Sequence, residues 1–209
     1  RDVLGSRGLG DVYKRQIKMV EIKKILHNKI YYYEQLDSTD LKALELAKQG
    51  AAEGTIVIAA RQTAGRGRMR RKWESPEGKG LWFSMILRPT IASEYCAQIT
   101  LLTAVAVVKA LQVLTDKNFS IKWPNDIMLD GKKVCGILAE MALAADGSIE
   151  YAVVGIGINI NMSSEDFGAQ LEATATSLYL ATGIEYEHEQ VLKALLDLSL
   201  IHISEPTRP

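Results

Sequence analysis

Residues 134 to 160, VCGILAEMALAADGSIEYAVVGIGINI, decide the fold, because two long apolar runs there flank one short polar turn. The turn, ADGS at 145 to 148, combines residue types that interrupt regular structure. The runs on either side, residues 134 to 143 and 150 to 160, are rich in β-branched and aliphatic side chains. The sequence therefore predicts two strands joined by a turn.

Outward from this pair, further strand and helix patterns follow one another along the chain. Strands are expected where short apolar or aromatic runs occur, at 29 to 36, 55 to 61, 81 to 89 and 119 to 123. Helices are expected from DSTD (37 to 40) to Gly50, from about 94 to 115, and over the remainder to about Leu198. This mixed order is typical of an α/β (α+β) fold, and we expect one mixed sheet with flanking helices on one side.

The charges of the chain balance, because 25 basic and 25 acidic side chains occur in 209 residues. A protein whose main partner is DNA or an anionic membrane usually carries a broad basic excess. With 47% hydrophobic residues, the chain has the composition of a globular domain. We therefore expect neither nucleic acid nor a membrane among its partners.

The longest apolar stretch, residues 99 to 114, is interrupted by Lys109 and Gln112 and is shorter than the ~20 residues that span a bilayer. It is expected to be a buried helix. Cys96 and Cys135 lie in apolar segments without metal-ligand spacing, which is typical of reduced core thiols and favours the cytoplasm.

The two ends of the chain differ from the rest. Residues 1 to 16 and 199 to 209 show no sustained strand or helix period, and the first segment lacks the apolar stretch of a secretory signal. We expect both tails to be non-native sequence and the domain to occupy residues 17 to 198.

A basic loop, GRGRMRRKW at 65 to 73, lies between the strands expected at 55 to 61 and 81 to 89. Long loops within a compact domain are usually functional. Arginine forks match phosphate and carboxylate oxygens, and glycine lets a ligand approach the backbone closely. A small anion is therefore one expected ligand; a solvated loop and a nucleic-acid-binding arm are the alternatives.

KWPND at 122 to 126 ends a strand in a rigid turn, because Pro124 fixes its own φ and keeps the preceding residue extended. Asn125 and Asp126 are then either functional groups at the strand end or turn residues bonded to their own backbone. Lys133 opens the next strand and returns toward Asp126. Its alternative role is a solvated hairpin charge.

VVGIGININ at 153 to 161 places two glycines in a buried strand, where glycine weakens the strand unless something approaches its backbone. The pattern is too short for a dinucleotide-binding fingerprint and lacks the helix that should follow. Asn159 is expected either to hydrogen-bond a base or to close the strand.

The motifs DSTD, RQTAGRGR with a following KW, KWPND, GKKVCGIL and GIGININ occur in this order. The ordered set resembles the catalytic domain of biotin–protein ligases over residues 31 to 198. The resemblance implies a fold similar to class II aminoacyl-tRNA synthetases and biotin–lipoate ligases. It also implies an ATP-dependent ligase that forms biotinyl-5′-AMP and transfers biotin to a lysine in the acceptor domain of a biotin-dependent carboxylase.

The resemblance also assigns roles to the residues at matching positions. The implied biotin contacts are Ser38, Thr39, Asp40, Gln62, Arg66, Gly67, Arg68, Lys133 and Gly136, and the implied nucleotide contacts are Arg68, Trp73, Asn125 and Asn159. Lys133, Arg68 and Asp126 are the implied catalytic residues. Lys133 is expected to stabilise the adenylation transition state, and Asp126 to orient the acceptor lysine.

Biotin and ATP are the implied substrates, and Mg²⁺ is expected to accompany ATP through phosphate oxygens and water, without a protein metal cluster. The basic loop is then expected to close over biotinyl-AMP and to become ordered as it does so. A monomer or a weak homodimer is expected.

The sequence departs from the family pattern at two positions. Asp40 replaces the usual Asn, so it either caps the helix or weakens biotin binding through its charge. Arg70 replaces the last glycine of GRGRxGR, which puts the loop geometry beyond Arg68 in doubt if that position needs φ > 0. The family's C-terminal β-barrel domain and the DNA-binding domain of the ligase–repressors have no counterpart here, so we expect a monofunctional enzyme.

Three other functions compete with this interpretation. A lipoate or octanoate ligase shares the fold and an analogous lysine, but lacks the GRGR and KWPND pair in this form. A nucleic-acid-binding module disagrees with the neutral net charge. A purely structural protein leaves the joint occurrence of the motifs unexplained.

Overall fold

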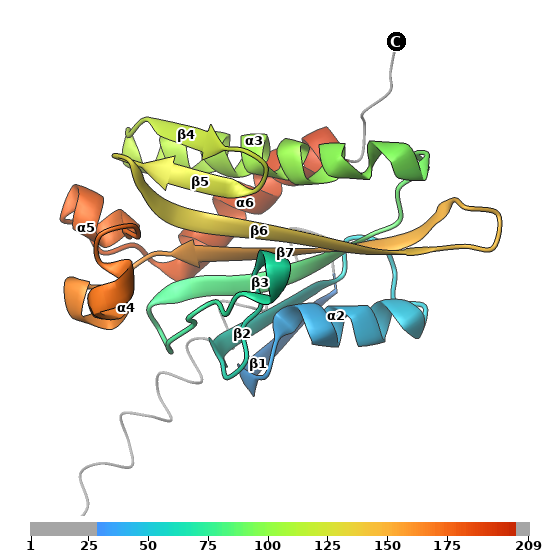
Figure 1. Cartoon of the computed structure of the whole chain (residues 1–209), viewed down its shortest axis with the longest axis horizontal. Coiled ribbons are helices and arrows are strands. Elements are labelled where there is room, and N and C mark those ends of the chain that lie inside the picture. Colours follow the sequence, from blue (N-terminus) through green and yellow to red (C-terminus); the bar gives the residue numbers. More distant parts are fainter. Residues whose placement is uncertain (1–28, 204–209) are drawn as a thin grey trace, which may run out of the picture.

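The computed structural model describes residues 29 to 203 as one seven-stranded sheet flanked by helices (Figure 1). The strands are β1 (Ile30–Leu36), β2 (Ile56–Gln62), β3 (Gly80–Leu87), β4 (Phe119–Lys122), β5 (Asp126–Leu129), β6 (Lys132–Leu143) and β7 (Ile149–Asn159). The helices are α2 (Thr39–Lys48), α3 (Cys96–Thr115), α4 (Ser164–Leu171), α5 (Leu178–Thr182) and α6 (His188–Ile203), with short 3-10 turns η1 (Arg68–Arg70) and η2 (Ser93–Tyr95). The expectation of an α/β fold with a mixed sheet is confirmed.

The strand order is β1-β2-β3-β7-β6-β5-β4, so the predicted hairpin of β6 and β7 lies within the sheet and β7 is its middle strand. β1 and β2 are parallel, whereas all the other neighbours are antiparallel. β3 pairs with β7 along its whole length, from Gly80 opposite Asn159 to Leu87 opposite Ala152. This pairing places β3, the strand that follows the basic loop, next to the glycine-bearing strand β7, with β2 on the other side of β3.

Helices cover both faces of the sheet, which corrects the expectation that they lie on one side (Figure 1). α3 and α6 pack on one face in a core that includes Phe83, Val107 and Leu192. α2 packs on the other face, where Ala43 lies in a second cluster with Val57. The strands are apolar on both sides, so a single layer of helices would leave one apolar face in water.

α3 matches the predicted long apolar helix, but only one of its faces is buried. Val107, Ala110 and Leu111 lie in the core, whereas Leu101 and Val113 are exposed. The segment Ser93–Thr115 is long and apolar enough to cross a membrane by length and composition alone, a test that the core helix of a globular protein also passes. Packing of its buried face against the sheet and α6 accounts for its apolar character.

The domain limits expected from sequence fall partly outside the described residues. The expected tail at 1 to 16 lies there entirely. α6 continues to Ile203, past residue 198 where the domain was expected to end. Cys135 is a buried free thiol, as expected, and burial raises its pKa.

Candidate active site

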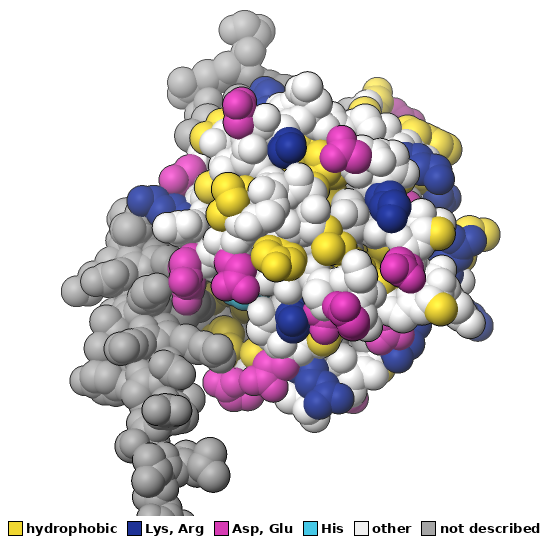
Figure 2. Space-filling model, turned by 90° about the vertical axis from the view of Figure 1, so that its left-hand side faces the viewer, with side chains coloured by type: hydrophobic (Ala, Val, Ile, Leu, Met, Phe, Trp, Pro, Cys, Tyr) yellow, Lys and Arg dark blue, Asp and Glu magenta, His cyan; other side chains and the backbone are white. Residues whose placement is uncertain are grey.

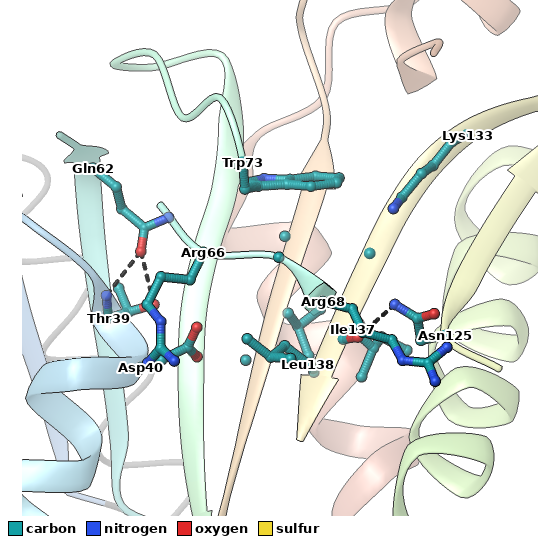
Figure 3. Close-up of a pocket in the computed structure, with 15 residues that line it drawn as sticks. Thr39, Asp40, Gln62, Arg66, Arg68, Trp73, Asn125, Lys133, Ile137 and Leu138 are labelled. Atoms are coloured by element: carbon teal, nitrogen blue, oxygen red, sulfur yellow. Dashed lines mark hydrogen bonds between the residues drawn. The ribbon is translucent and has the colours of Figure 1, made fainter. Parts of the chain in front are cut away.

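A pocket with about 410 Å³ of open space lies over the middle of β6 and β7, below the basic loop and beside the start of α2 (Figure 3). Its lining contains Thr39, Asp40, Gln62, Arg66, Gly67, Arg68, Trp73, Asn125, Lys133, Gly136, Ile137, Leu138, Gly155, Ile156 and Gly157. Five segments that are far apart in the sequence therefore meet at one site, and most of the residues proposed from sequence are among them.

The two glycines of β7 let side chains lie directly on the sheet. A Cβ atom on Gly155 would collide with the carboxylate of Asp40. A Cβ atom on Gly157 would lie 2.5 Å from Nε1 of Trp73, and one on Gly136 would lie 2.9 Å from Cζ3 of the same ring. The close approach that the sequence predicted for a glycine-bearing buried strand is confirmed.

Fixed polar groups form one end of the pocket. Gln62 Oε1 accepts hydrogen bonds from the backbone N–H of Thr39 (2.8 Å) and from its hydroxyl (3.1 Å). Gln62 Nε2 donates to Ser75 Oγ at 2.8 Å, so both ends of the amide are held. Ser84, buried on β3, places its hydroxyl 2.8 Å from Thr39 Oγ1. These contacts fix the orientation of the amide before any ligand arrives.

Asp40 is buried against β7, and Ser84 Oγ lies 2.7 Å from its Oδ1. Burial raises the pKa of Asp40 to about 6, and the negative charge of Glu140 adds to the rise. The hydrogen bond from Ser84 and the positive charge of Arg66 act in the opposite direction. Asp40 therefore accepts a hydrogen bond from Ser84 that joins α2 to β3. Its side chain does not cap α2, where Ser38 occupies the N-cap position.

A β-bulge aims Lys133 at the pocket. The register of β5 and β6 shifts between Ile127 and Met128, so Val134 of β6 has no paired residue in β5. Because strand side chains alternate, an inserted residue lets both Lys133 and Gly136 face the pocket while Val134 and Cys135 both enter the core. The bulge had no clear signal in the sequence.

Lys133 occupies the opposite end of the pocket from Gln62 (Figure 3). Its Nζ lies 2.6 Å from Asp126 Oδ1 and 5.0 Å from the ring centroid of Trp73. Trp73 in turn makes an edge contact with Trp82, at 6.3 Å between centroids. The indole nitrogen of Trp73 is buried and has no hydrogen-bond partner among the described residues.

Two asparagines proposed from sequence occupy different positions. Asn125 lines the pocket, and its Nδ2 donates to the backbone carbonyl of Ile137 at 3.1 Å. Asn159 is buried at the end of β7 and donates to the carbonyl of Thr176 at 3.0 Å. Asn159, like Ser38 and Asp126, is absent from the residues that line the pocket.

The basic loop crosses the pocket with its two leading arginines on different sides. Figure 3 shows Arg66 beside Asp40 and Arg68 toward Asn125. Arg66 forms two hydrogen bonds to Glu140, of 2.8 and 2.6 Å. Met69 and Arg70 have φ of 57° and 61°, so the position where the family pattern has glycine does adopt the left-handed conformation.

Ser84 and Glu140 are two polar residues of this site that sequence reasoning missed. Both are single polar residues within apolar strands, LWFSMIL and VCGILAEMAL, and that interruption was the available signal. Their partners Asp40 and Arg66 are distant in the sequence, so only the folded structure assigns a role to the interruption.

The fold and pocket define a class of protein with a site on a mixed sheet that carries fixed hydrogen-bonding groups at one end and the cation Lys133 at the other. The chain belongs to the biotin/lipoate A/B protein ligase family, whose sequence profile matches residues 32 to 159. The resemblance found in the motifs is therefore confirmed at the level of the family.

Individual relatives agree with this assignment. The chain is 42% identical over 187 residues to the bifunctional ligase/repressor BirA of Bacillus spizizenii, covering 90% of this chain and 57% of that protein. It is 37% identical over 164 residues to the biotin–[acetyl-CoA-carboxylase] ligase of Paracoccus denitrificans, covering 76% and 66%. The solved biotin protein ligase of Aquifex aeolicus in complex with biotin and ATP has a TM-score of 0.73 and 34% identity, covering 85% of this chain and 71% of the other. The chain thus spans little more than half the length of the Bacillus relative.

Proposed function

We propose that the protein is an ATP-dependent ligase that converts biotin to biotinyl-5′-AMP and transfers the biotinyl group to a lysine of an acceptor domain. The observation that carries the proposal is the polarity of the pocket. Fixed hydrogen-bonding groups at Thr39 and Gln62 lie at one end, and the cations Lys133 and Arg68 lie toward the other. The similarity to the Paracoccus denitrificans biotin–[acetyl-CoA-carboxylase] ligase and to the Aquifex aeolicus biotin protein ligase in complex with biotin and ATP supports this choice.

Biotin is proposed to lie with its polar ring at the Gln62 end and its carboxylate near Lys133. The ring carries N–H and C=O groups that match the fixed donors and acceptors there. Ser38 contributes from the start of α2, because its buried hydroxyl has no hydrogen-bond partner among the described residues. A buried polar atom of this kind is expected to find a partner.

The first step joins two negatively charged reactants. The biotin carboxylate attacks the α-phosphorus of ATP, a new C–O–P linkage forms, and pyrophosphate leaves. Lys133 and Arg68 lower the barrier by neutralising the charge that develops on the carboxylate and phosphate oxygens. Gly67 and Gly136 leave room for the ligand beside the loop and β6.

In the second step the amine of an acceptor lysine attacks the biotinyl carbonyl, an amide forms, and AMP leaves. The attacking amine must lose a proton. Asp126, already within 2.6 Å of Lys133, is placed to orient that amine at the edge of the pocket.

The nucleotide is proposed to contact Arg68, Trp73, Asn125 and Asn159. The unpaired indole N–H of Trp73 supplies a donor for a phosphate or carboxylate oxygen. Among residues 29 to 203 no group of three or more His, Cys, Asp or Glu side chains is arranged to hold a metal ion. Mg²⁺ is therefore proposed to arrive with ATP, bound through phosphate oxygens and water.

The proposed partner is the acceptor domain of a biotin-dependent carboxylase, and the proposed location is the cytoplasm. A nucleic-acid partner is not proposed. Figure 2 shows basic and acidic side chains interspersed over one face of the molecule, and the chain carries no net charge. Phosphate-backbone binding depends on a basic excess. A monomer or weak homodimer is proposed as the state in solution.

Transfer to a purified biotin carboxyl carrier domain tests the proposal. The protein, biotin, MgATP and the domain are incubated together, and the mass of the domain is followed. The proposal predicts a mass increase of one biotinyl group that disappears when the acceptor lysine is replaced by arginine. An unchanged mass, with a biotin ligase of known activity as positive control, would contradict it.

A further inference from the structure

The two leading arginines of the basic loop have different surroundings, although only Gly67 separates them. Both terminal nitrogens of Arg66 donate to the two carboxylate oxygens of Glu140, at 2.8 and 2.6 Å. The Arg66 and Glu140 side chains retain about a third of their exposure, 34% and 31%. The guanidinium of Arg68 forms no hydrogen bond or ion pair with any described residue, and Arg68 is one of the residues that line the pocket.

Glu140 is a rigid attachment point for the loop. It lies within the long strand β6 and pairs with Val153 of the middle strand β7. Arg66 reaches it from a position 74 residues away in the chain. A bidentate fork between arginine and carboxylate fixes direction as well as distance.

Fixing Arg66 also fixes the segment that carries Arg68. Arg66 forms an isolated β-bridge with Lys72, and the N–H of Gly67 donates to the carbonyl of Arg71 at 2.7 Å. Arg68 lies at the tip of this small closed turn. The position of the Arg68 side chain over the pocket therefore depends on where Arg66 is anchored.

Electrostatics oppose release of Arg66 toward a ligand. Glu140 and Asp40 are both acidic and close enough to influence each other, and Arg66 offsets the charge of Asp40 as well as pairing with Glu140. If Arg66 left to bind an anion, these carboxylates would remain near an anionic ligand without their cation.

We propose that Glu140 is a positioning residue for the proposed ligase reaction: it anchors Arg66, so that the loop holds Arg68 over the pocket and Arg68 is the arginine of this pair that meets the anionic centre of the ligand. This inference rests on the proposed function.

A charge swap separates an anchoring role of Arg66 from direct ligand contact. Arg66→Glu alone and Glu140→Arg alone are expected to raise the KM for biotin in pyrophosphate exchange by about tenfold or more, since each places like charges together. The double variant Arg66→Glu with Glu140→Arg is expected to recover most of that loss. No recovery in the double variant relative to Arg66→Glu would overturn the inference.

Arg68 provides the matched comparison, because it has no acidic ion-pair partner among the described residues with which its charge could be swapped. Combining Arg68→Glu with Glu140→Arg is expected to be at least as poor as Arg68→Glu alone. Recovery of activity in that combination would overturn the inference, since it would show that Glu140 serves both arginines.

A second readout needs no ligand and no activity. Trypsin cleavage within residues 66 to 72 of the ligand-free protein is expected to be about tenfold faster in Glu140→Gln than in the unchanged protein. Glu74→Gln, which removes the exposed pair with Lys72 on the same loop, is the control and is expected to leave the rate unchanged. Equal cleavage rates for Glu140→Gln and the unchanged protein would overturn the inference that Glu140 anchors the loop through Arg66.

The two readouts distinguish failure of the anchor from failure of the proposed function. If the unchanged protein catalyses no biotin-dependent exchange, the ligase proposal fails and with it the assignment of Arg68 to the anion. If the unchanged protein is active but the swap brings no recovery, the ligase proposal stands and the division of roles between the arginines is wrong.

Discussion

Lys133 Nζ lies 2.6 Å from Asp126 Oδ1, and both side chains remain about a quarter exposed at the edge of the pocket. The β-bulge in β6 makes this contact possible, because it turns Lys133 toward the pocket two positions before the buried Cys135. Under the proposed function, this pair would put a cation beside the acyl phosphate and a carboxylate beside the acceptor amine.

Substitutions of Lys133 and Asp126 are expected to impair different steps of the reaction. Lys133→Ala should lower biotin-dependent pyrophosphate exchange about 10²–10³-fold, because the charge on the transition state loses a preorganised cation. Asp126→Asn should lower transfer from preformed biotinyl-AMP to the acceptor domain about 10–100-fold, with a smaller effect on exchange. Single-turnover transfer and exchange, measured on both variants, check this. Equal losses in both steps for Asp126→Asn would contradict its role at the acceptor amine.

Asp40 is expected to make stability depend on pH. Its pKa of about 6 in the folded protein lies above the ordinary value of 3.8, so the folded state favours the protonated acid. The contribution to stability is present below pH 3.8 and is lost as pH rises through about 6, with a magnitude of up to about 3 kcal/mol. Asp40→Asn should therefore raise the free energy of unfolding at pH 8.

Urea unfolding of the unchanged protein and of Asp40→Asn at about pH 4 and pH 8 checks this linkage. The variant is expected to be more stable at pH 8 and close to the unchanged protein at pH 4. Glu53→Gln, which alters an exposed acid before β2, serves as a control on general charge effects. A stability difference for Asp40→Asn that is the same at both pH values would mean that ionisation of Asp40 is not its cause.

Arg70 holds the left-handed conformation, with φ of 61°, which costs a non-glycine residue about 1–2 kcal/mol. Arg70→Gly is expected to stabilise the loop, seen as slower proteolysis of the ligand-free protein with a protease that cleaves beside Met69. Arg71, with φ of −69°, supplies the control. Arg71→Gly removes the same charge but should loosen the loop, which would appear as faster proteolysis. If both substitutions speed proteolysis, the left-handed conformation of Arg70 does not determine the stability of the loop.

Gly157→Ala is expected to displace Trp73, because the new Cβ would lie 2.5 Å from its Nε1. Biotin affinity by calorimetry should fall about tenfold or more, since the ring helps to form the pocket wall. In combination with Trp73→Ala, the glycine substitution should cost little further, because the colliding ring is gone. Fully additive losses would show that Gly157 acts independently of Trp73.

Much of the fold could be predicted from apolar periodicity. The run at 134 to 160 predicted the β6–β7 hairpin correctly, and the flanking runs predicted β1 to β4 near their observed limits. β5 was not predicted, because KWPND was interpreted as a strand end followed by a turn. The prediction that helices lie on only one face of the sheet was wrong, because helices cover both faces. Helix α2 packs on the sheet through two small residues, Ala43 and Ala47. Small residues give only a weak hydrophobic periodicity in the sequence.

The site was predictable where the backbone requires a particular residue type, because that residue type is visible in the sequence. Gly155, Gly157 and the basic loop are such marks, and the structure brings them together. Residues whose role depends on a distant partner were not predictable in this way. Glu140 matters because Arg66 reaches it from another segment, and Lys133 faces the pocket because of a bulge.

The most direct test of the central claim is biotin-dependent exchange of labelled pyrophosphate into ATP, with lipoate and octanoate in parallel. This half-reaction needs no acceptor domain, so it isolates the chemistry assigned to the pocket. The account predicts exchange with biotin, none with the other two acids, and loss of exchange in Lys133→Ala and Arg68→Ala. Exchange that is supported equally by octanoate or lipoate, or that is undiminished in Lys133→Ala, would contradict it.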